Sequence, residues 1–512
     1  MATRYDAVVV GAGLGGLSAA AQLATRGHSV LLLERHNVPG GYATSFVRGR
    51  FEFEVALHEL SGIGRPGKPG TLLKYLEKIG VAERVEFVRI DDFYRSVFPG
   101  FSLTVPVGIE RATTTLCEAF PHEADGIRRF LDRVFGMGRE LDHVNRVFGR
   151  GVPAPGNLAT LPWKARKLLR YGTCTWGQVL DRDVGDPLAR AVLSQAWGYL
   201  GLPPSQVGFA HLAAVLHAYV AGQPAYVVGR SQALSSAFVD AIEERGGEVR
   251  LGCGVSSITV RDGRVSWVVT ERGEEIAADA VISNADPVTT CRDLVGARHL
   301  SRRFWKGLRP SEPGPSSFNV YLGAARSADE LGVTDHETFI NADADPDAHW
   351  AQMGTLGAPA VLVMSCYNVC SADVSPPGTS MFGLTTLQYG DQWHDVAPAD
   401  YLDTKHRIAD AMIEMAESVV PGLRSAAEVV AASTPVTNMR FVGHQGGAVY
   451  GFDNHPWDAH VFRMSNRAPL GGLYFAGAWA MPGGGFEPSM MSGRMAAEMV
   501  HAATRTSLRK GA

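Results

Sequence analysis

The sequence lacks a strong excess of either charge. Its 512 residues carry 48 lysines and arginines against 52 aspartates and glutamates, a formal net charge of −4 at pH 7. Nucleic-acid-binding proteins generally present a basic patch or stripe, so we expect no nucleic-acid partner. The sequence also shows no zinc-ligand spacing, no P-loop and no Ser-His-Asp signature. Neither a metal site nor hydrolase chemistry is predicted.

Cysteines are few, and neither a signal peptide nor a membrane span is evident. Six cysteines are scattered along the chain, and we expect reduced thiols in a cytoplasmic protein. Cys366 and Cys370 form one close pair, but no further ligand follows at metal-binding spacing. Only four residues precede the first predicted strand. Residues 7–25 lack charge, yet their four glycines and strand-then-helix pattern argue against a membrane span.

Residues 191–229 contain no Asp, Glu, Lys or Arg. A Pro-Pro pair at 203–204 divides this stretch, and residues 206–221 are long enough for a buried helix but short for a bilayer span. Two compatible interpretations stay open. The stretch is a core helix of a second domain, or it forms a wall of an apolar substrate cavity.

The most informative pattern lies in the first 46 residues. An apolar run leads into Gly-Ala-Gly-Leu-Gly-Gly at 11–16, an alanine-rich helical segment follows, and a second apolar run ends in Glu34. Strand, glycine turn, helix and acid-tipped strand in this order predict a dinucleotide site. The added Pro-Gly-Gly at 39–41 favours FAD over NAD as the cofactor.

Each part of this opening has a physical role. Gly11 permits the tight turn, Gly13 lets the backbone approach a pyrophosphate, and Gly16 lets the helix pack close to the strand. The helix N-terminus offers free N–H groups and a partial positive charge to phosphates. The Glu34 carboxylate is placed to accept a hydrogen bond from a ribose hydroxyl.

Later segments look like returns of the chain to this nucleotide domain. A strand ending in a polar turn is predicted at 280–285, and a strand running into a glycine-rich turn at 472–485. The other predicted helices and strands include helices over 71–80, 232–245, 401–420 and 489–503, strands over 86–90, 94–98, 248–251, 255–261, 265–270, 318–322, 360–365 and 381–387, and a loop at 151–156. We predict an FAD domain assembled from residues 1–75, 225–300 and 435–512, and a substrate domain from 76–224 and 301–434.

Motifs at both ends and in the middle of the chain carry a family resemblance. They are Pro-Gly-Gly-Tyr-Ala-Thr-Ser-Phe at 39–46, Phe-Glu-Phe-Glu-Val-Ala-Leu-His at 51–58, and segments at 226–234, 433–437, 447–451 and 472–494. Through them the chain resembles the FAD-dependent carotenoid (phytoene) desaturase, carotenoid isomerase and retinol saturase family.

The resemblance implies an α/β fold. A Rossmann-like FAD-binding domain of the amine-oxidase type is assembled from three segments, with an inserted α+β substrate domain. The flavin ring would face a long apolar tunnel for polyenes or other isoprenoid lipids. By position, the resemblance implies a set of cofactor-binding residues: Gly11, Gly13, Leu14, Gly15, Gly16, Glu34, Arg35, Gly40, Gly41, Tyr42, Val255, Gly477, Gly484, Gly485 and Phe486.

Three positions depart from the family pattern. Arg230 stands where a second glycine is expected after Tyr226, Ala56 replaces a glycine before His58, and Glu487 follows Phe486 where small or apolar residues are usual. A buried charge is costly unless it is paired. Either Arg230 and Glu487 form a structural pair, or they bring polar groups to the flavin for a polar substrate handle or a proton transfer.

His58 and Trp479 complete the catalytic candidates beside Arg230 and Glu487. His58 is suited to proton transfer at neutral pH, or is a hydrogen-bonded structural histidine. Trp479 stacks on flavin or substrate, or packs in the core. Residues 163–170 alternate basic and apolar side chains, which suits contact with the inner face of an anionic membrane or a plain exposed helix end.

We therefore expect an FAD-dependent oxidoreductase or isomerase that desaturates, saturates or isomerises carbon–carbon double bonds of an apolar substrate. The cofactor would perform the chemistry, and the protein would supply orientation and a dry cavity. Two alternatives stay open. One is a flavin amine oxidase, which would carry a lysine near the flavin. The other is a non-catalytic isoprenoid-binding relative of the same fold.

Overall fold

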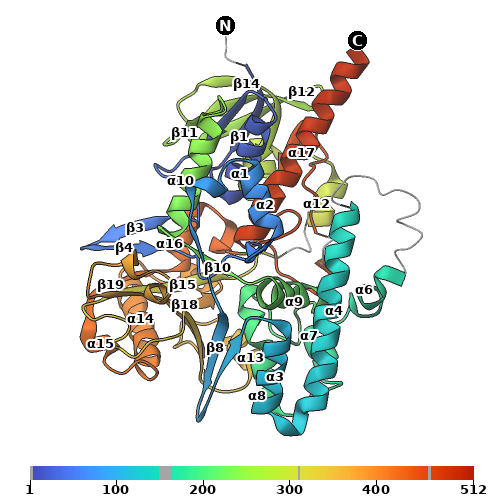
Figure 1. Cartoon of the computed structure of the whole chain (residues 1–512). Helices are drawn as coiled ribbons and strands as arrows, with labels where there is room; N and C mark the ends of the chain where they lie inside the picture. Colours follow the sequence, from blue (N-terminus) through green and yellow to red (C-terminus); the bar gives the residue numbers. More distant parts are fainter. Residues whose placement is uncertain (1–3, 149–162, 309–311, 459–462, 512) are drawn as a thin grey trace.

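The computed structural model describes residues 4–148, 163–308, 312–458 and 463–511 (Figure 1). Two seven-stranded sheets organise these residues. The predicted loop at 151–156 lies outside them. The α/β fold with a Rossmann-like cofactor half is confirmed.

The first sheet has the strand order β11-β2-β1-β14-β13-β12, and β20 also pairs with β14. Its centre is parallel, because β1 pairs in parallel with both β2 and β14. Residues 7–10 of β1 and all residues of β2 and β20 are apolar and buried, as a sheet covered on both faces requires. Their bounds are β1 (Arg4–Val10), β2 (Val30–Leu33), β11 (Glu248–Arg250), β12 (Val255–Arg261), β13 (Arg264–Thr270), β14 (Glu275–Ser283) and β20 (Leu473–Phe475).

Three long helices from distant parts of the chain pack together beside this sheet (Figure 1). They are α1 (Leu14–Thr25), α10 (Arg230–Glu243) and α17 (Phe486–Gly511). The contact between α1 and α17 depends on glycine, because a Cβ placed on Gly493 would lie 2.0 Å from the carbonyl oxygen of Gly15. The cofactor half is thus completed by α17, the last helix that the structure describes.

The second sheet has the order β19-β15-β18-β17-β16-β8-β9 and is antiparallel except where β16 pairs with β8. Apolar residues of α14 (Tyr401–Glu417) share a core with its strands. The strand bounds are β8 (Asp92–Phe98), β9 (Phe101–Pro106), β15 (Ser316–Ala324), β16 (Glu337–Asn341), β17 (Val361–Cys366), β18 (Ser380–Gln388) and β19 (Ala427–Ser433).

Shorter elements complete the described chain. The remaining strands form three two-stranded sheets: β3 (Ser45–Arg48) with β4 (Phe51–Glu54), β5 (Gly64–Arg65) with β6 (Lys68–Pro69), and β7 (Phe87–Arg89) with β10 (Ala225–Val227). The remaining α-helices are α2 (Thr71–Lys78), α3 (Ile109–Ala119), α4 (Ala124–Phe148), α6 (Arg166–Tyr171), α7 (Trp176–Leu180), α8 (Pro187–Ser194), α9 (Phe209–Leu216), α11 (Pro287–Thr289), α12 (Arg302–Leu308), α13 (Pro346–Gln352), α15 (Leu423–Ala426) and α16 (Pro435–Val442).

The structure corrects several element predictions. The helix predicted over 206–221 begins only at Phe209, and its last part, His217–Ala221, is a π-helical segment. The β3–β4 hairpin, β16 and β19 were not predicted as strands. The division into domains stays a prediction. All strands of the first sheet come from the three segments assigned to the FAD domain, and all strands of the second come from the other two.

Candidate active site

One cavity of about 610 Å³ runs from the glycine turn after β1 to the second sheet. Its far part is walled mainly by apolar side chains, including Trp197, Leu200, Val215, Phe339, Val361 and Leu387. Several of these come from the charge-free stretch 191–229. Residues of that stretch also belong to the buried core, and that the cavity takes a substrate stays a prediction.

The glycine turn has the geometry that a dinucleotide site requires. Gly11 has φ of +95°, in the region that favours glycine, and its N–H donates to the Leu33 carbonyl at 2.8 Å. The first turn of α1 follows Gly13 with no side-chain cap. The N–H groups of such a turn suit an anion.

Glycines here leave room that any side chain would fill. A Cβ on Gly13 would lie 2.5 Å from the Asn284 amide nitrogen, and one on Gly477 would lie 2.5 Å from its Oδ1. That Oδ1 is buried without a hydrogen-bond partner among the described residues. A glycine cradle around an unpartnered buried acceptor is what a bound hydroxyl or N–H donor would complete, so the residues present fit a dinucleotide.

The structure brings the predicted cofactor residues together. All but Gly16 line the cavity: Gly11, Gly13, Leu14, Gly15, Glu34, Arg35, Gly40, Gly41, Tyr42, Val255, Gly477, Gly484, Gly485 and Phe486. Gly16 instead packs α1 on the turn, because a Cβ there would lie 1.9 Å from the Gly11 carbonyl oxygen. The contacts of these residues with a cofactor stay a prediction.

The Glu34 side chain stabilises the glycine turn by hydrogen bonds to main-chain N–H groups. Its carboxylate accepts from the Ala12 N–H at 2.7 Å and from the His36 N–H at 2.8 Å. A carboxylate has about four acceptor positions, so these two bonds leave capacity for a ribose hydroxyl.

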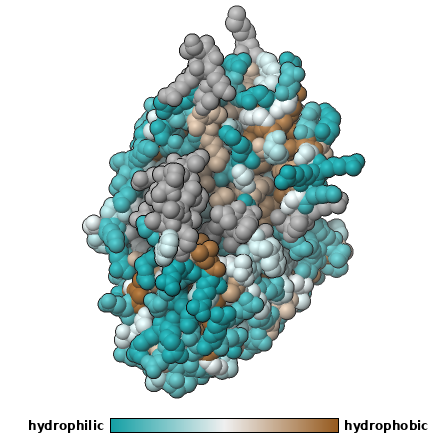
Figure 2. All heavy atoms as spheres, turned by 90° about the vertical axis from the view of Figure 1, so that its right-hand side faces the viewer, coloured by the Kyte–Doolittle hydropathy of each residue, from teal (hydrophilic) through white to brown (hydrophobic). Residues whose placement is uncertain are grey.

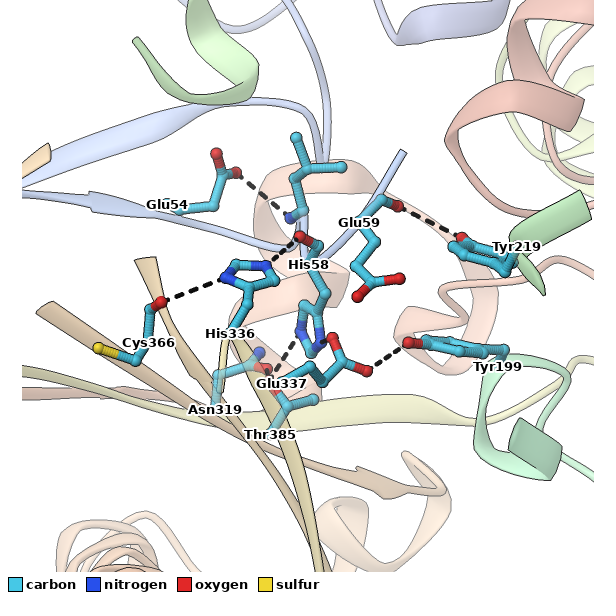
Figure 3. Close-up of polar contacts among 11 residues, drawn as sticks. Glu54, His58, Glu59, Tyr199, Tyr219, Asn319, His336, Glu337, Cys366 and Thr385 are labelled. Atoms are coloured by element: carbon cyan, nitrogen blue, oxygen red, sulfur yellow. Dashed lines mark hydrogen bonds and ion pairs between the residues drawn. The ribbon is translucent and has the colours of Figure 1, made fainter. Parts of the chain in front are cut away.

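His58 belongs to a polar cluster that sequence reasoning found only in part (Figure 3). Its Nδ1 lies 3.3 Å from the Glu337 carboxylate, and its Nε2 lies 3.4 Å from the Thr385 hydroxyl. Thr385 donates its own proton to Asn319 at 2.9 Å, so its oxygen is left to accept from His58.

Glu337 and the main chain fix this histidine. The Glu337 side chain is fully buried and also accepts from the Tyr199 hydroxyl. His336 donates from Nε2 to the His58 carbonyl at 2.8 Å. Its Nδ1 faces the Cys366 carbonyl at 3.2 Å, and burial lowers the pKa of His336 against the raising effect of these two carbonyls.

Glu59 is the unusual member of the cluster. Its side chain lines the cavity and points between His58 and the two tyrosines Tyr199 and Tyr219 (Figure 3). The residue is 5% exposed, and neither carboxyl oxygen has a hydrogen-bond partner among the described residues. Burial, and next the charge of Glu337, raise the pKa of Glu59 well above its ordinary value.

Glu487 also lines the cavity, at the first turn of α17. Its carboxylate accepts from the Ser61 hydroxyl, and burial raises the pKa of Glu487. The suggested pair between Arg230 and Glu487 is wrong. Arg230 binds Glu52 on β4 instead, 3.1 Å from its carboxylate.

The contacts of Arg230 explain how an arginine can stand where the family pattern has a glycine. Arg230 keeps a glycine-like backbone, with φ of +68°, which costs an L-residue roughly 1–2 kcal/mol. Three hydrogen bonds offset this cost, to the Glu52 carbonyl at 2.7 Å, to the Glu52 carboxylate and to the Val374 carbonyl. Arg230 is not among the described residues that line the cavity.

Trp479 packs in a small core cluster with Ala448 and Phe452. Its ring lies edge-on to Phe452, with centroids 4.8 Å apart. Core packing, the second interpretation offered for Trp479, describes this position. Trp479 too is absent from the described cavity wall.

Sequence reasoning missed Glu59, Glu337, Tyr199, Tyr219, Asn319 and Thr385. One signal was available for Glu59, since it follows His58 directly within an otherwise apolar segment. Among the described residues, no cluster of His, Cys, Asp and Glu could hold a metal ion. No helix in the part of the chain that the structure describes is long and apolar enough to span a membrane.

Comparison with known proteins places this geometry in context. The model of the family described as flavin containing amine oxidoreductase matches residues 14–501. Prolycopene isomerase 1, chloroplastic, from an Oncidium hybrid cultivar is 26% identical over 98% of this chain and 84% of its own length. All-trans-retinol 13,14-reductase of Rattus norvegicus is 26% identical over 93% and 82% of the two chains.

A third relative is the hydroxyneurosporene desaturase of Rubrivivax gelatinosus, 27% identical over 97% of this chain and 93% of its own length. Among solved structures, putrescine oxidase bound to putrescine has a TM-score of 0.64 and 16% identity, covering 98% of this chain and 99% of that one. At that identity the likeness concerns the fold alone.

Proposed function

Because the chain belongs to the flavin containing amine oxidoreductase family, we propose that it acts on carbon–carbon double bonds of an apolar polyene or isoprenoid lipid. The protein is an FAD-dependent oxidoreductase. The observation that carries the proposal is the apolar part of the cavity, which continues directly from the glycine turn. The names of the three relatives, an isomerase, a reductase and a desaturase of such molecules, support it.

When bound, the flavin supplies hydride exchange with a carbon next to a double bond. The glycine turn and the first turn of α1 would hold its pyrophosphate, and Glu34 its ribose. The far walls exclude water and bind the substrate by apolar burial, at about 25 cal/mol per Å². His58 and Glu487, both in the cavity wall, are the candidates to hold or move a proton.

Desaturation, saturation and cis–trans isomerisation are three reactions that the same cavity could support. A single experiment separates them. The purified holoenzyme, oxidised or reduced without air, is incubated with polyenes of defined geometry, and products are analysed by chromatography and mass spectrometry. Desaturation lowers the product mass by two hydrogens, saturation raises it by two, and isomerisation changes retention at constant mass.

The amine oxidase alternative is tested in the same preparation. That alternative expects a lysine in the wall, and the described part of the wall contains none. Amine-dependent peroxide formation without any polyene binding would overturn the proposal. Tight polyene binding without turnover by either flavin state would favour a non-catalytic relative of the fold.

We further propose that the protein collects its substrate at an anionic membrane surface. Trp163 is 75% exposed and Leu169 is 72% exposed, and exposed Lys164, Arg166 and Arg170 lie beside them. Basic side chains near an anionic bilayer contribute about 1 kcal/mol each. Figure 2 shows the face that includes this region as mainly hydrophilic with separate apolar patches, so contact would be local and peripheral.

A further inference from the structure

The carboxyl group of Glu59 is the one polar group of the cavity cluster with both oxygens unused. Glu337 accepts from the Tyr199 hydroxyl through one oxygen and faces His58 Nδ1 with the other at 3.3 Å, and Glu487 accepts from Ser61. Glu59 contacts Tyr219 only through its main-chain carbonyl, at 3.3 Å. A buried polar group without a partner costs free energy, and a group that also faces a cavity can recover it from a ligand.

We propose that Glu59 binds a hydroxyl group at the end of an otherwise apolar substrate. This inference rests on the proposed function and adds a specificity site to it. The far wall has apolar stretches, and polar groups near Glu59 such as Thr385 and Glu487 already have hydrogen-bond partners, so an anchor at Glu59 would set which end of a long substrate enters first. Orientation of this kind is what a few placed polar groups supply in an apolar pocket.

The chemistry of the cluster selects a hydroxyl over a cation. The Glu337 carboxyl group already faces His58 Nδ1 at 3.3 Å and accepts from the Tyr199 hydroxyl. Two carboxyl groups in one apolar site do not both ionise readily, so Glu59 is the member that keeps its proton. A neutral carboxyl group both donates and accepts, as a hydroxyl does, whereas an ammonium group needs an ionised partner.

The test compares ligands that differ only in their end group. All-trans-retinol, its hydrocarbon counterpart ending in CH₃ and retinylamine are titrated into the FAD-loaded protein. Quenching of tryptophan fluorescence reports binding, since Trp197 lines the cavity. Retinol is expected to bind at least about tenfold more tightly than the hydrocarbon, the ratio that one net hydrogen bond supplies.

Variants assign the difference to Glu59. Glu59→Leu should bring the retinol-to-hydrocarbon ratio to within about twofold of one, while hydrocarbon affinity is kept or improved. Glu59→Gln, whose amide also donates and accepts, should keep most of the preference. Glu428→Leu, on the exposed outer strand β19, is the matched substitution and should leave the ratio unchanged.

Each other outcome is decisive. An unchanged ratio in Glu59→Leu would overturn the hydroxyl site and leave the proposed function standing, because the polyenes still bind. If retinylamine binds most tightly and Glu59→Leu abolishes this preference, the ligand of Glu59 is a cation and the hydroxyl proposal is overturned. Failure of all three ligands to bind would overturn the proposed function and this inference with it.

Discussion

The two ends of the cavity are built in different ways. At the cofactor end, the wall is rich in glycines from residues 11–41 and 477–485, which leave room that a side chain would fill. At the far end, the wall is formed by side chains from β16, β18, the 3-10 helix Gln195–Tyr199 and the segment after β4, which meet only in the folded molecule. The first kind of site needs one residue type at fixed spacing. The second kind fixes no spacing at all.

The largest expected effect is a loss of FAD affinity when a side chain fills the space that a glycine leaves at the cofactor end. A Cβ in Gly15→Ala would lie 2.4 Å from both the Asn284 Oδ1 and the Gly477 nitrogen. We expect FAD affinity to fall at least about 100-fold, a cost of ~3 kcal/mol, measured as bound flavin absorbance after gel filtration. Gly307→Ala, where nothing lies within 4 Å of the added carbon, is the control. Full flavin content in Gly15→Ala would show that the cofactor end does not depend on the space that its glycines leave.

Arg230 gives a smaller effect and tests whether side chains can replace a glycine. Arg230→Ala keeps the strained φ of +68° but loses all three hydrogen bonds, so we expect a loss of about 2–3 kcal/mol in the free energy of unfolding. Arg230→Gly should recover about 1 kcal/mol of that loss, because glycine adopts this φ freely. Urea unfolding measures both. Equal stability of the two variants would show that backbone strain is not part of the site.

At the far end of the cavity, buried Glu59 is expected to lower the free energy of unfolding by an amount that depends on pH. Since the folded-state pKa of Glu59 lies above its ordinary value of 4.5, the unfolded chain loses this proton first as pH rises. Wild-type stability should therefore fall relative to Glu59→Gln above pH about 4.5, by at most about 1.4 kcal/mol per pH unit until the folded-state pKa is reached. Denaturant unfolding at pH 5 and pH 8 measures the change, and a difference independent of pH would contradict it.

The smallest effect on stability is expected at the exposed pair Trp163 and Leu169. Replacing both by serine should change the free energy of unfolding by less than about 0.5 kcal/mol and still reduce flotation with anionic liposomes. Neutral liposomes provide the comparison, since the adjacent basic residues would have no opposite charge to meet. Equal flotation of wild type and variant would show that Trp163 and Leu169 do not mediate membrane binding.

These contrasts explain which parts of the molecule could be predicted. The β1–α1–β2 unit follows from its own sequence, because turn, helix and acid-tipped strand are local. Glu337 lies far from Glu59 in sequence and on a strand, β16, that was not predicted, so nothing in the sequence joined the two carboxyl groups. Arg230 departs from the family pattern and is visible in the sequence for that reason, but its partner Glu52 lies on a hairpin that was not predicted as strands.

The contact between α1 and α17 has a consequence for biosynthesis. The helix α1, which begins the cofactor site, is synthesised more than 400 residues before Gly493, which fits against it. During synthesis the glycine turn is therefore present long before the part of the cavity wall that α17 supplies. Stable flavin loading should follow synthesis of α17, and a chain that stops short of α17 should be colourless.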